Sequence, residues 1–178
     1  MPRDKNIIQE VPGFYRIIKL KLFRKTPGVS FDILGKGQVP KIDAIDRVLH
    51  QNGAVSPGSV GEVERPWYLH PHQDDNLMVL SGTRLVDIYT IEQGRVESFT
   101  VTPDRIEMKG KVLYDGAAML VWPRNVFHRI RSLEHGSASI NLATHYEGWD
   151  VSNNFSIYDL DIETGDYRVI REGFKDQF

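Results

Sequence analysis

Two histidines two positions apart, His70 and His72, have the type and spacing that could do chemistry. They lie in the stretch WYLHPHQDDNLMVLSG, which begins at Trp67. Side chains alternate along a β-strand, so a strand here would turn both imidazoles to one face. Imidazole nitrogens bind divalent transition metals, and the chain has no cysteine to supply thiolates. The doublet therefore predicts half of a metal site whose other ligands are histidine, carboxylate or amide.

The segment DGAAMLVWPRNVFHRI offers a third ligand, His128. In it an apolar strand is followed by a turn that begins at Pro123, and His128 starts the next strand. We expect this turn to bring His128 back toward the interior of the sheet. Asp75 or Asn76 could be a fourth ligand, and only Asp75 would lower the net charge of the site. Three protein ligands leave open positions for water, oxygen or a chelating substrate.

The elements that must position these residues are short strands separated by turn signals from residue 67 onward. NLMVLSG should end a strand at Gly82, and further strands are expected on both sides of residues 134–136. YDLDIETGDYRVI is typical of a hairpin with Gly165 at its tip. KIDAIDRVLHQ, residues 41–51, fits a helix or a strand. Many short strands indicate an all-β barrel or sandwich.

The histidine segments resemble the two motifs of the cupin superfamily, over about residues 60–146. In the first motif, His70 and His72 supply the histidine pair, and Gly82 supplies the closing glycine. Asp75 or Asn76 takes the place of the usual glutamate.

The second motif is carried by Gly116, Pro123 and His128, which stand in the family's order. Asn125 replaces a usual glycine, and the closing asparagine is absent at the family's spacing. The resemblance implies a cupin double-stranded β-helix, or jelly-roll, barrel of the RmlC-like type. We expect an N-terminal extension at 1–60, the barrel at 61–160, and a C-terminal hairpin and tail at 161–178.

The resemblance also implies one divalent transition metal ion, iron, manganese, nickel or zinc. Its predicted ligands are His70, His72 and His128, with Asp75 or Asn76. The favoured function is a metal-dependent isomerase or dioxygenase that chelates a small oxygen-rich molecule.

Two alternatives stay open. The first is a metal-free sugar-nucleotide epimerase or ketoisomerase, because PRNVFH also resembles that branch of the cupins. In that branch a histidine base and a tyrosine acid act beside cationic residues that hold the diphosphate. The candidates would be His70 or His72 as base, Tyr89 or Tyr146 as acid, and Arg65, Arg84 and Arg129 as phosphate ligands. The second alternative is a cupin that binds a small ligand without catalysis.

Two strand patterns add candidates for the lining of a pocket. In SASINLATHY, Asn141 and His145 share a small, polar face that could point into the barrel. In TRLVDIYT, Asp87 and Tyr89 share one face, and Arg84 lies on the other. A buried aspartate needs a partner, so Asp87 inside the barrel would indicate a polar ligand or an ion pair.

Composition narrows the class of protein. With 178 residues, 40% of them apolar, the chain is long enough for one globular domain with its own core. A net charge of −2 provides no basic field for nucleic acid, and no apolar run is long enough to span a bilayer. The first ten residues have no apolar core typical of a signal peptide. We expect a cytoplasmic homodimer that binds a small molecule.

Overall fold

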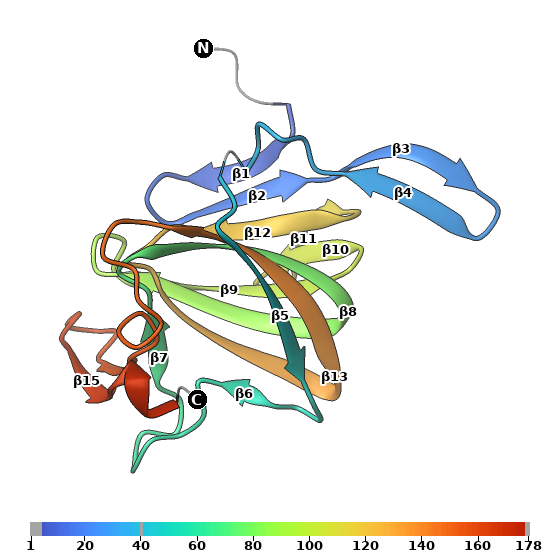
Figure 1. Ribbon diagram of the computed structural model, residues 1–178. Coiled ribbons are helices and arrows are strands. Elements are labelled where there is room, and N and C mark those ends of the chain that lie inside the picture. Colours follow the sequence, from blue (N-terminus) through green and yellow to red (C-terminus); the bar gives the residue numbers. More distant parts are fainter. Residues whose placement is uncertain (1–4, 40, 177–178) are drawn as a thin grey trace.

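The computed structural model describes residues 5–39 and 41–176, which form an almost wholly β-stranded molecule (Figure 1). One short 3₁₀ helix, η1 (Gly173–Asp176), follows the last strand. The strands are β1 (Ile7–Val11), β2 (Tyr15–Lys19), β3 (Lys21–Thr26), β4 (Val29–Ile33), β5 (Ala44–His50), β6 (Val55–Ser56), β7 (Trp67–Leu69), β8 (Gln73–Thr90), β9 (Arg95–Thr102), β10 (Arg105–Met108), β11 (Lys111–Asp115), β12 (Ala118–Trp122), β13 (Phe127–His145), β14 (Ile157–Leu160) and β15 (Tyr167–Arg171).

Two long strands, β8 and β13, form the framework of the barrel. They pair antiparallel from Tyr89 with Phe127 to Gln73 with His145. The first half of β8 also pairs with β12, and its second half pairs with β9. On its other edge β13 pairs with β5, β6 and β7. Each long strand therefore belongs to both walls of the barrel, which is the jelly-roll arrangement expected from the sequence (Figure 1).

Glycines bend these two strands where they cross. Gly82 in β8 and Gly136 in β13 both have φ of 72°, which L-residues with a side chain rarely adopt. A Cβ on Gly82 would lie 2.2 Å from the Gly136 carbonyl oxygen, and one on Gly136 would lie 2.3 Å from the His50 carbonyl oxygen. The sequence predicted separate strands on each side of these glycines, and that was wrong. Glycine here lets one continuous strand turn from one wall to the other.

The N-terminal residues are built into the same sheet. Strand β2 pairs with β12, and β1 pairs with β2. Residues 41–51, which fit either a helix or a strand, contain β5, which turns Asp46 and His50 inward and Ile45 outward. The β3–β4 hairpin pairs only with itself and projects from the barrel (Figure 1). The domain boundaries at residues 60 and 160 stay predictions.

The apolar core lies between the two walls of the barrel, on strands β2, β8, β9 and β12. Leu77 and Trp122 of this core also line a cavity that contains many polar residues. Among the residues that the structure describes, no helix has the length and apolar character needed to cross a membrane. The buried core residues are Phe14, Tyr15, Ile17, Leu77, Val79, Val86, Ile88, Phe99, Val101, Ile106, Ala118, Leu120, Trp122 and Val126.

Candidate functional site

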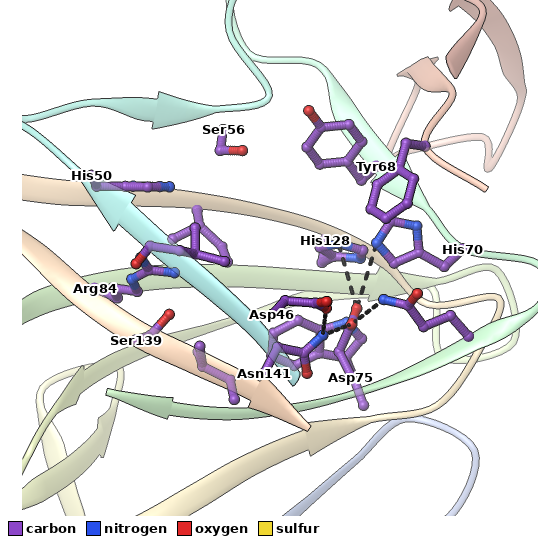
Figure 2. A pocket seen from close by; sticks show the side chains of 16 residues that line it. Asp46, His50, Ser56, Tyr68, His70, Asp75, Arg84, His128, Ser139 and Asn141 are labelled. Atoms are coloured by element: carbon purple, nitrogen blue, oxygen red, sulfur yellow. Dashed lines mark hydrogen bonds and ion pairs between the residues drawn. The ribbon is translucent and has the colours of Figure 1, made fainter. Parts of the chain in front are cut away.

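The barrel holds a cavity of about 320 Å³. Strands β5, β7, β8 and β13 supply most of its lining, because side chains alternate and every second one points inward. Figure 2 shows a wall with many polar groups, which is unusual for the inside of a barrel. The lining residues are Asp46, Val48, His50, Ser56, Tyr68, His70, Gln73, Asp75, Leu77, Arg84, Trp122, His128, Ile130, Ser139, Asn141 and Phe155.

Three buried residues converge at one end of this cavity: His70, Asp75 and His128 (Figure 2). Asp75 Oδ2 lies 3.6 Å from His70 Nε2 and 3.8 Å from His128 Nε2. The ring centroids of the two histidines are 4.6 Å apart. The turn after β12 therefore does bring His128 back to the interior, opposite the start of β8.

Backbone carbonyls fix the tautomers of both imidazoles. His70 Nδ1 lies 2.5 Å from the Asn154 carbonyl oxygen, and His128 Nδ1 lies 3.2 Å from the Val126 carbonyl oxygen. A carbonyl oxygen only accepts, so we assign the proton of each neutral ring to Nδ1. Both Nε2 atoms then carry a free lone pair directed toward the cavity and Asp75.

Asp75 is held by neutral donors on its other oxygen. Gln73 Nε2 donates to Asp75 Oδ1 at 2.8 Å, and Asn141 Nδ2 donates to the same oxygen at 2.6 Å. Asn141 Nδ2 also donates to Asp46 Oδ2 at 3.0 Å. These bonds orient the Asp75 carboxylate and leave Oδ2 to face the two imidazoles.

Burial controls the charge of this cluster. Removal from water lowers the pKa of His128 to about 4, and the nearby His70 adds to this effect, while Asp75 opposes it. His128 is therefore neutral near neutral pH. Burial also raises the pKa of Asp46 and the pKa of the Tyr68 hydroxyl.

The donor set at this end of the cavity fits a divalent transition metal ion. His70, Asp75 and His128 offer two lone pairs and one carboxylate oxygen within 4.8 Å of one another. Tetrahedral ligands at usual metal–ligand lengths lie about 3.3 Å apart, close to the observed spacing. Such an ion would supply Lewis acidity toward a carbonyl oxygen when bound. The expected metal stays a prediction.

Two predicted metal ligands, His72 and Asn76, lie outside the cavity lining. The expectation that His70 and His72 share a face assumed a continuous strand. The chain bends at Pro71, between β7 and β8, so strand alternation does not extend across it. Asn76 alternates with Asp75 and points to the other face of β8, where Nδ2 donates to the Leu142 carbonyl oxygen at 2.6 Å.

Two of the five predicted pocket residues line the cavity, and three do not. Arg84 and Asn141 line the cavity, and Asp87, Tyr89 and His145 do not. After the bend of β8 at Gly82, the side chains that point inward are Arg84 and the apolar residues that alternate with those on the outer face. Asp87 is on the outer face, where its Oδ2 accepts from Arg129 Nε at 3.0 Å.

Tyr89 and His145 make other contacts, outside the cavity lining. Tyr89 belongs to an apolar cluster with Trp67 and Phe127, beneath the C-terminal hairpin. His145 stacks on Trp149, with ring centroids 3.9 Å apart. On β13, Ser139 and Asn141 line the cavity, so the polar face expected to point inward does so; His145 shares this face but is the last residue of the strand and lies beyond the lining.

Five polar lining residues were not identified from the sequence: Asp46, His50, Ser56, Tyr68 and Ser139. Tyr68 had a usable signal, because it stands two positions before His70. Its ring centroid is 6.0 Å from that of His70 and 5.9 Å from that of His128. Asp46 and His50 reach the site only because β5 pairs with β13, a pairing far apart in sequence.

No protein-family model and no curated protein matches this chain. Solved structures do. A dTDP-6-deoxy-D-glucose-3,5-epimerase, RmlC, from Legionella pneumophila has a TM-score of 0.58 and 12% identity, covering 92% of this chain and 84% of that chain. The WlaRB TDP-quinovose 3,4-ketoisomerase from Campylobacter jejuni has a TM-score of 0.54 and 14% identity, covering 79% and 90%.

A third similar structure is the 3,4-ketoisomerase QdtA from Thermoanaerobacterium thermosaccharolyticum, solved as a variant in complex with TDP-4-keto-6-deoxyglucose. Its TM-score is 0.55 at 14% identity, with 79% of this chain and 85% of that chain covered. These likenesses show that the chain has the RmlC-like jelly-roll fold. The similar structures are sugar-nucleotide epimerases and ketoisomerases. The metal-dependent isomerase or dioxygenase favoured from the sequence is therefore wrong, and the sugar-nucleotide alternative agrees better.

Proposed function

We propose that this protein is an epimerase or ketoisomerase that acts on a nucleotide-linked keto sugar. The observation that carries the proposal is the free Nε2 lone pair of His70, held toward a polar cavity by the bond from Nδ1 to Asn154. A base in this position can remove the acidic hydrogen of a carbon next to a ketone. The solved structures of similar fold include enzymes described as carrying out this class of reaction.

The proposed reaction needs a base, an acid and a stabilised charge. His70 Nε2 takes the proton from the carbon next to the ketone, and the electron pair of that bond forms an enediol(ate). The Asp75 carboxylate, 3.6 Å away, stabilises the imidazolium that results. Reprotonation on the opposite face of the same carbon gives the epimer. Where the first carbon carries a hydroxyl group, protonation of the former ketone carbon with loss of that hydroxyl proton moves the ketone to the first carbon and gives the isomer.

Tyr68 is the proposed acid. Its side chain lines the cavity beside His70, and burial raises the pKa of its hydroxyl, so it holds its proton near neutral pH. The two tyrosines suggested from the sequence lie elsewhere. Tyr89 is in the apolar cluster beneath the C-terminal hairpin, and the half-exposed Tyr146 donates its hydroxyl proton to Asp74 Oδ2 at 2.7 Å.

The nucleotide must extend out of the barrel. At about 320 Å³ the cavity is at the small end of the range for ligand pockets, about 300–1,000 Å³. We infer that it takes the sugar and leaves the diphosphate at the mouth. Arg65 and Arg129, two of the suggested phosphate ligands, are absent from the cavity lining, and Arg129 is already paired with Asp87.

Proton exchange in deuterium oxide tests the proposal directly. Purified protein is incubated with dTDP-4-keto-6-deoxyglucose, and the sugar protons are followed by NMR. We expect deuterium to replace hydrogen at carbons next to the ketone, with or without accumulation of a new sugar. His70→Asn should slow this exchange at least about 100-fold, because general bases contribute about 10²–10⁴. Tyr68→Phe should retain exchange at the first carbon and lose product formation.

A matched control is His135→Asn, which replaces a fully exposed histidine outside the site. It should exchange at the wild-type rate. Absence of exchange with 4-keto sugars of dTDP, UDP and GDP alike would refute the proposed function.

The metal prediction has its own test. A metal ion on this cluster would occupy His70 Nε2, the atom proposed as the base, so metal binding and base catalysis at His70 exclude each other. If the metal prediction holds, wild-type protein reloaded with zinc, iron, manganese or nickel retains about one equivalent by elemental mass spectrometry, and its proton exchange is slower than in the metal-free protein. Asp75→Asn should lose most of the metal, because the charged ligand is removed with little change of shape. Equal retention by wild type and variant would place the ion elsewhere.

Two further expectations belong with this proposal. We propose a homodimer, because the projecting β3–β4 hairpin leaves Phe23 57% and Leu22 51% exposed. The cytoplasmic location expected from the sequence stays a prediction.

A further inference from the structure

Arg84 is a buried cation with no acidic partner. It is 1% exposed and lines the cavity. Its Nε donates to Ser137 Oγ at 2.9 Å, and one terminal nitrogen donates to the Val48 carbonyl oxygen at 3.1 Å. Both acceptors are neutral. Across residues 5–39 and 41–176, no carboxylate forms an ion pair with Arg84.

A structural role alone does not account for this arrangement. Burying a guanidinium without a counter-charge costs several kcal/mol, and two bonds to neutral oxygens satisfy only two of its five N–H groups. Loss of water also lowers the pKa of Arg84 to about 10, which still leaves it cationic. A residue kept in this state usually has its counter-charge supplied by a ligand.

Two neighbouring polar atoms also lack partners. Ser139 Oγ and His50 Nδ1 are buried, and neither has a hydrogen-bond partner among the described residues. Ser139 is 1% exposed and His50 is 9% exposed. Both line the cavity, and Figure 2 shows them with Arg84 at the end away from His70 and Asp75. Buried polar groups are nearly always satisfied, so these atoms point to an absent ligand.

The charges in the cavity select the kind of anion. Arg84 supplies one positive charge, and His50 is neutral near neutral pH because burial lowers its pKa to about 4. The cavity already contains the acidic side chains of Asp46 and Asp75. A carboxylate carries one charge and matches the planar guanidinium with two parallel bonds. A phosphate dianion would bring one more negative charge than a carboxylate into a cavity that already holds Asp46 and Asp75.

We propose that Arg84, His50 and Ser139 form a subsite for a carboxylate that has a hydroxyl group on an adjacent carbon. Arg84 binds the carboxylate, and Ser139 and His50 Nδ1 bind the hydroxyl. Because the opposite end of the cavity holds His70, this inference rests on the proposed function and narrows its substrate. The keto sugar would be a sugar acid, such as a nucleotide-linked uronate.

Direct binding tests the subsite without catalysis. Isotope-labelled protein is titrated with D-glucuronate, and the Arg84 Nε–H signal is followed by NMR. D-glucose serves as the neutral probe and inorganic phosphate as the second anion. We expect glucuronate to shift the Arg84 signal with saturation, and glucose to leave it unchanged. Arg84→Gln should weaken glucuronate binding at least tenfold, and Arg84→Lys should weaken it less.

A second pair of variants keeps Arg84 in place. Ser137→Asp sets a carboxylate where the serine oxygen now contacts Arg84, and Ser137→Asn has the same shape without the charge. We expect Ser137→Asp to melt at a higher temperature than Ser137→Asn and to lose glucuronate binding. This result would mean that the arginine lacks a counter-charge in the free protein.

Three results would overturn the carboxylate subsite. The first is that wild type and Arg84→Gln bind glucuronate with equal affinity, and the second is that phosphate binds at least as tightly as glucuronate. The third is that Ser137→Asp melts at a temperature no higher than that of Ser137→Asn. Each leaves the deuterium-exchange test of the proposed function unaffected. Conversely, glucuronate binding at Arg84 without exchange on any keto sugar would refute the enzyme and retain the subsite.

Discussion

At the scale of single residues, the surroundings of each histidine decide its chemistry. His70 and His128 are buried and oriented by backbone carbonyls, with both Nε2 atoms near one carboxylate. His72, two residues from His70, lies outside the cavity lining. His135 is exposed and pairs only with its neighbour Glu134. The four histidine side chains are chemically identical, but only those of His70 and His128 are placed where they can act in the cavity, because the fold gives each a different environment.

His50 makes stability depend on pH at this scale. Burial and then the nearby Arg84 cation lower the pKa of His50 from 6.5 to about 4, and a backbone hydrogen bond to Ala54 opposes them. Between these two pH values, His50 is protonated in the unfolded chain and neutral in the folded chain. The contribution of His50 to stability is full above pH 6.5 and is lost as the pH falls from 6.5 to 4, by an amount on the order of 3 kcal/mol.

The check is urea unfolding at a series of pH values across this window. His50→Gln cannot titrate, so its unfolding free energy should fall less steeply than that of the wild type. An identical slope in both proteins would mean that His50 is protonated in the folded state, and would contradict the assigned environment.

At the scale of elements, the crossing of β8 and β13 sets the shape of the cavity. The two strands can bend here because Gly82 and Gly136 combine positive φ with very close backbone contacts. The pairing of β5 with β13 then brings Asp46 and His50 to the inner wall. Arg84 stands two residues after the bend in β8, so the bend also determines where its side chain enters.

Gly136→Ala should destabilise the fold by more than about 3 kcal/mol, because it adds backbone overlap to an unfavourable φ. Gly110→Ala is the matched control. Gly110 has a similar φ of 78°, but a Cβ there would meet nothing within 4 Å. It should lose only about 1 kcal/mol. Chemical denaturation measures both, and equal losses would mean that the crossing can relax.

At the scale of the whole molecule, the β3–β4 hairpin is the part that the barrel leaves uncovered. A two-stranded hairpin is at best marginally stable alone in water. This one has an aromatic pair, Phe23 and Phe31, with ring centroids 6.0 Å apart, and its apolar side chains face outward. The exposed apolar residues are Leu22, Phe23, Val29, Phe31 and Ile33.

We expect a second copy of the chain to cover this hairpin, since small apolar arms are stabilised by burial against a partner. Light scattering after size exclusion should give twice the mass of one chain for the wild type. The double variant Phe23→Ser with Phe31→Ser should give a single chain. Val112→Ser, at an exposed apolar residue on β11, should remain dimeric. A wild type that elutes as a single chain at tens of micromolar would contradict the prediction.

The sequence by itself determined the all-β class and singled out His70, Asp75 and His128, which the fold then brings together. These depend on local patterns, namely strand alternation, turn residues and motif order. Only the tertiary structure decided that His72, Asp87 and Tyr89 lie outside the cavity and that Asp46, His50 and Tyr68 lie in it. Which face of a strand is the inner one depends on its partners across the sheet, and those partners are distant in sequence. The lack of an acidic partner for Arg84 could not be predicted from the sequence either. It can be recognised only when the positions of all residues around Arg84 are known.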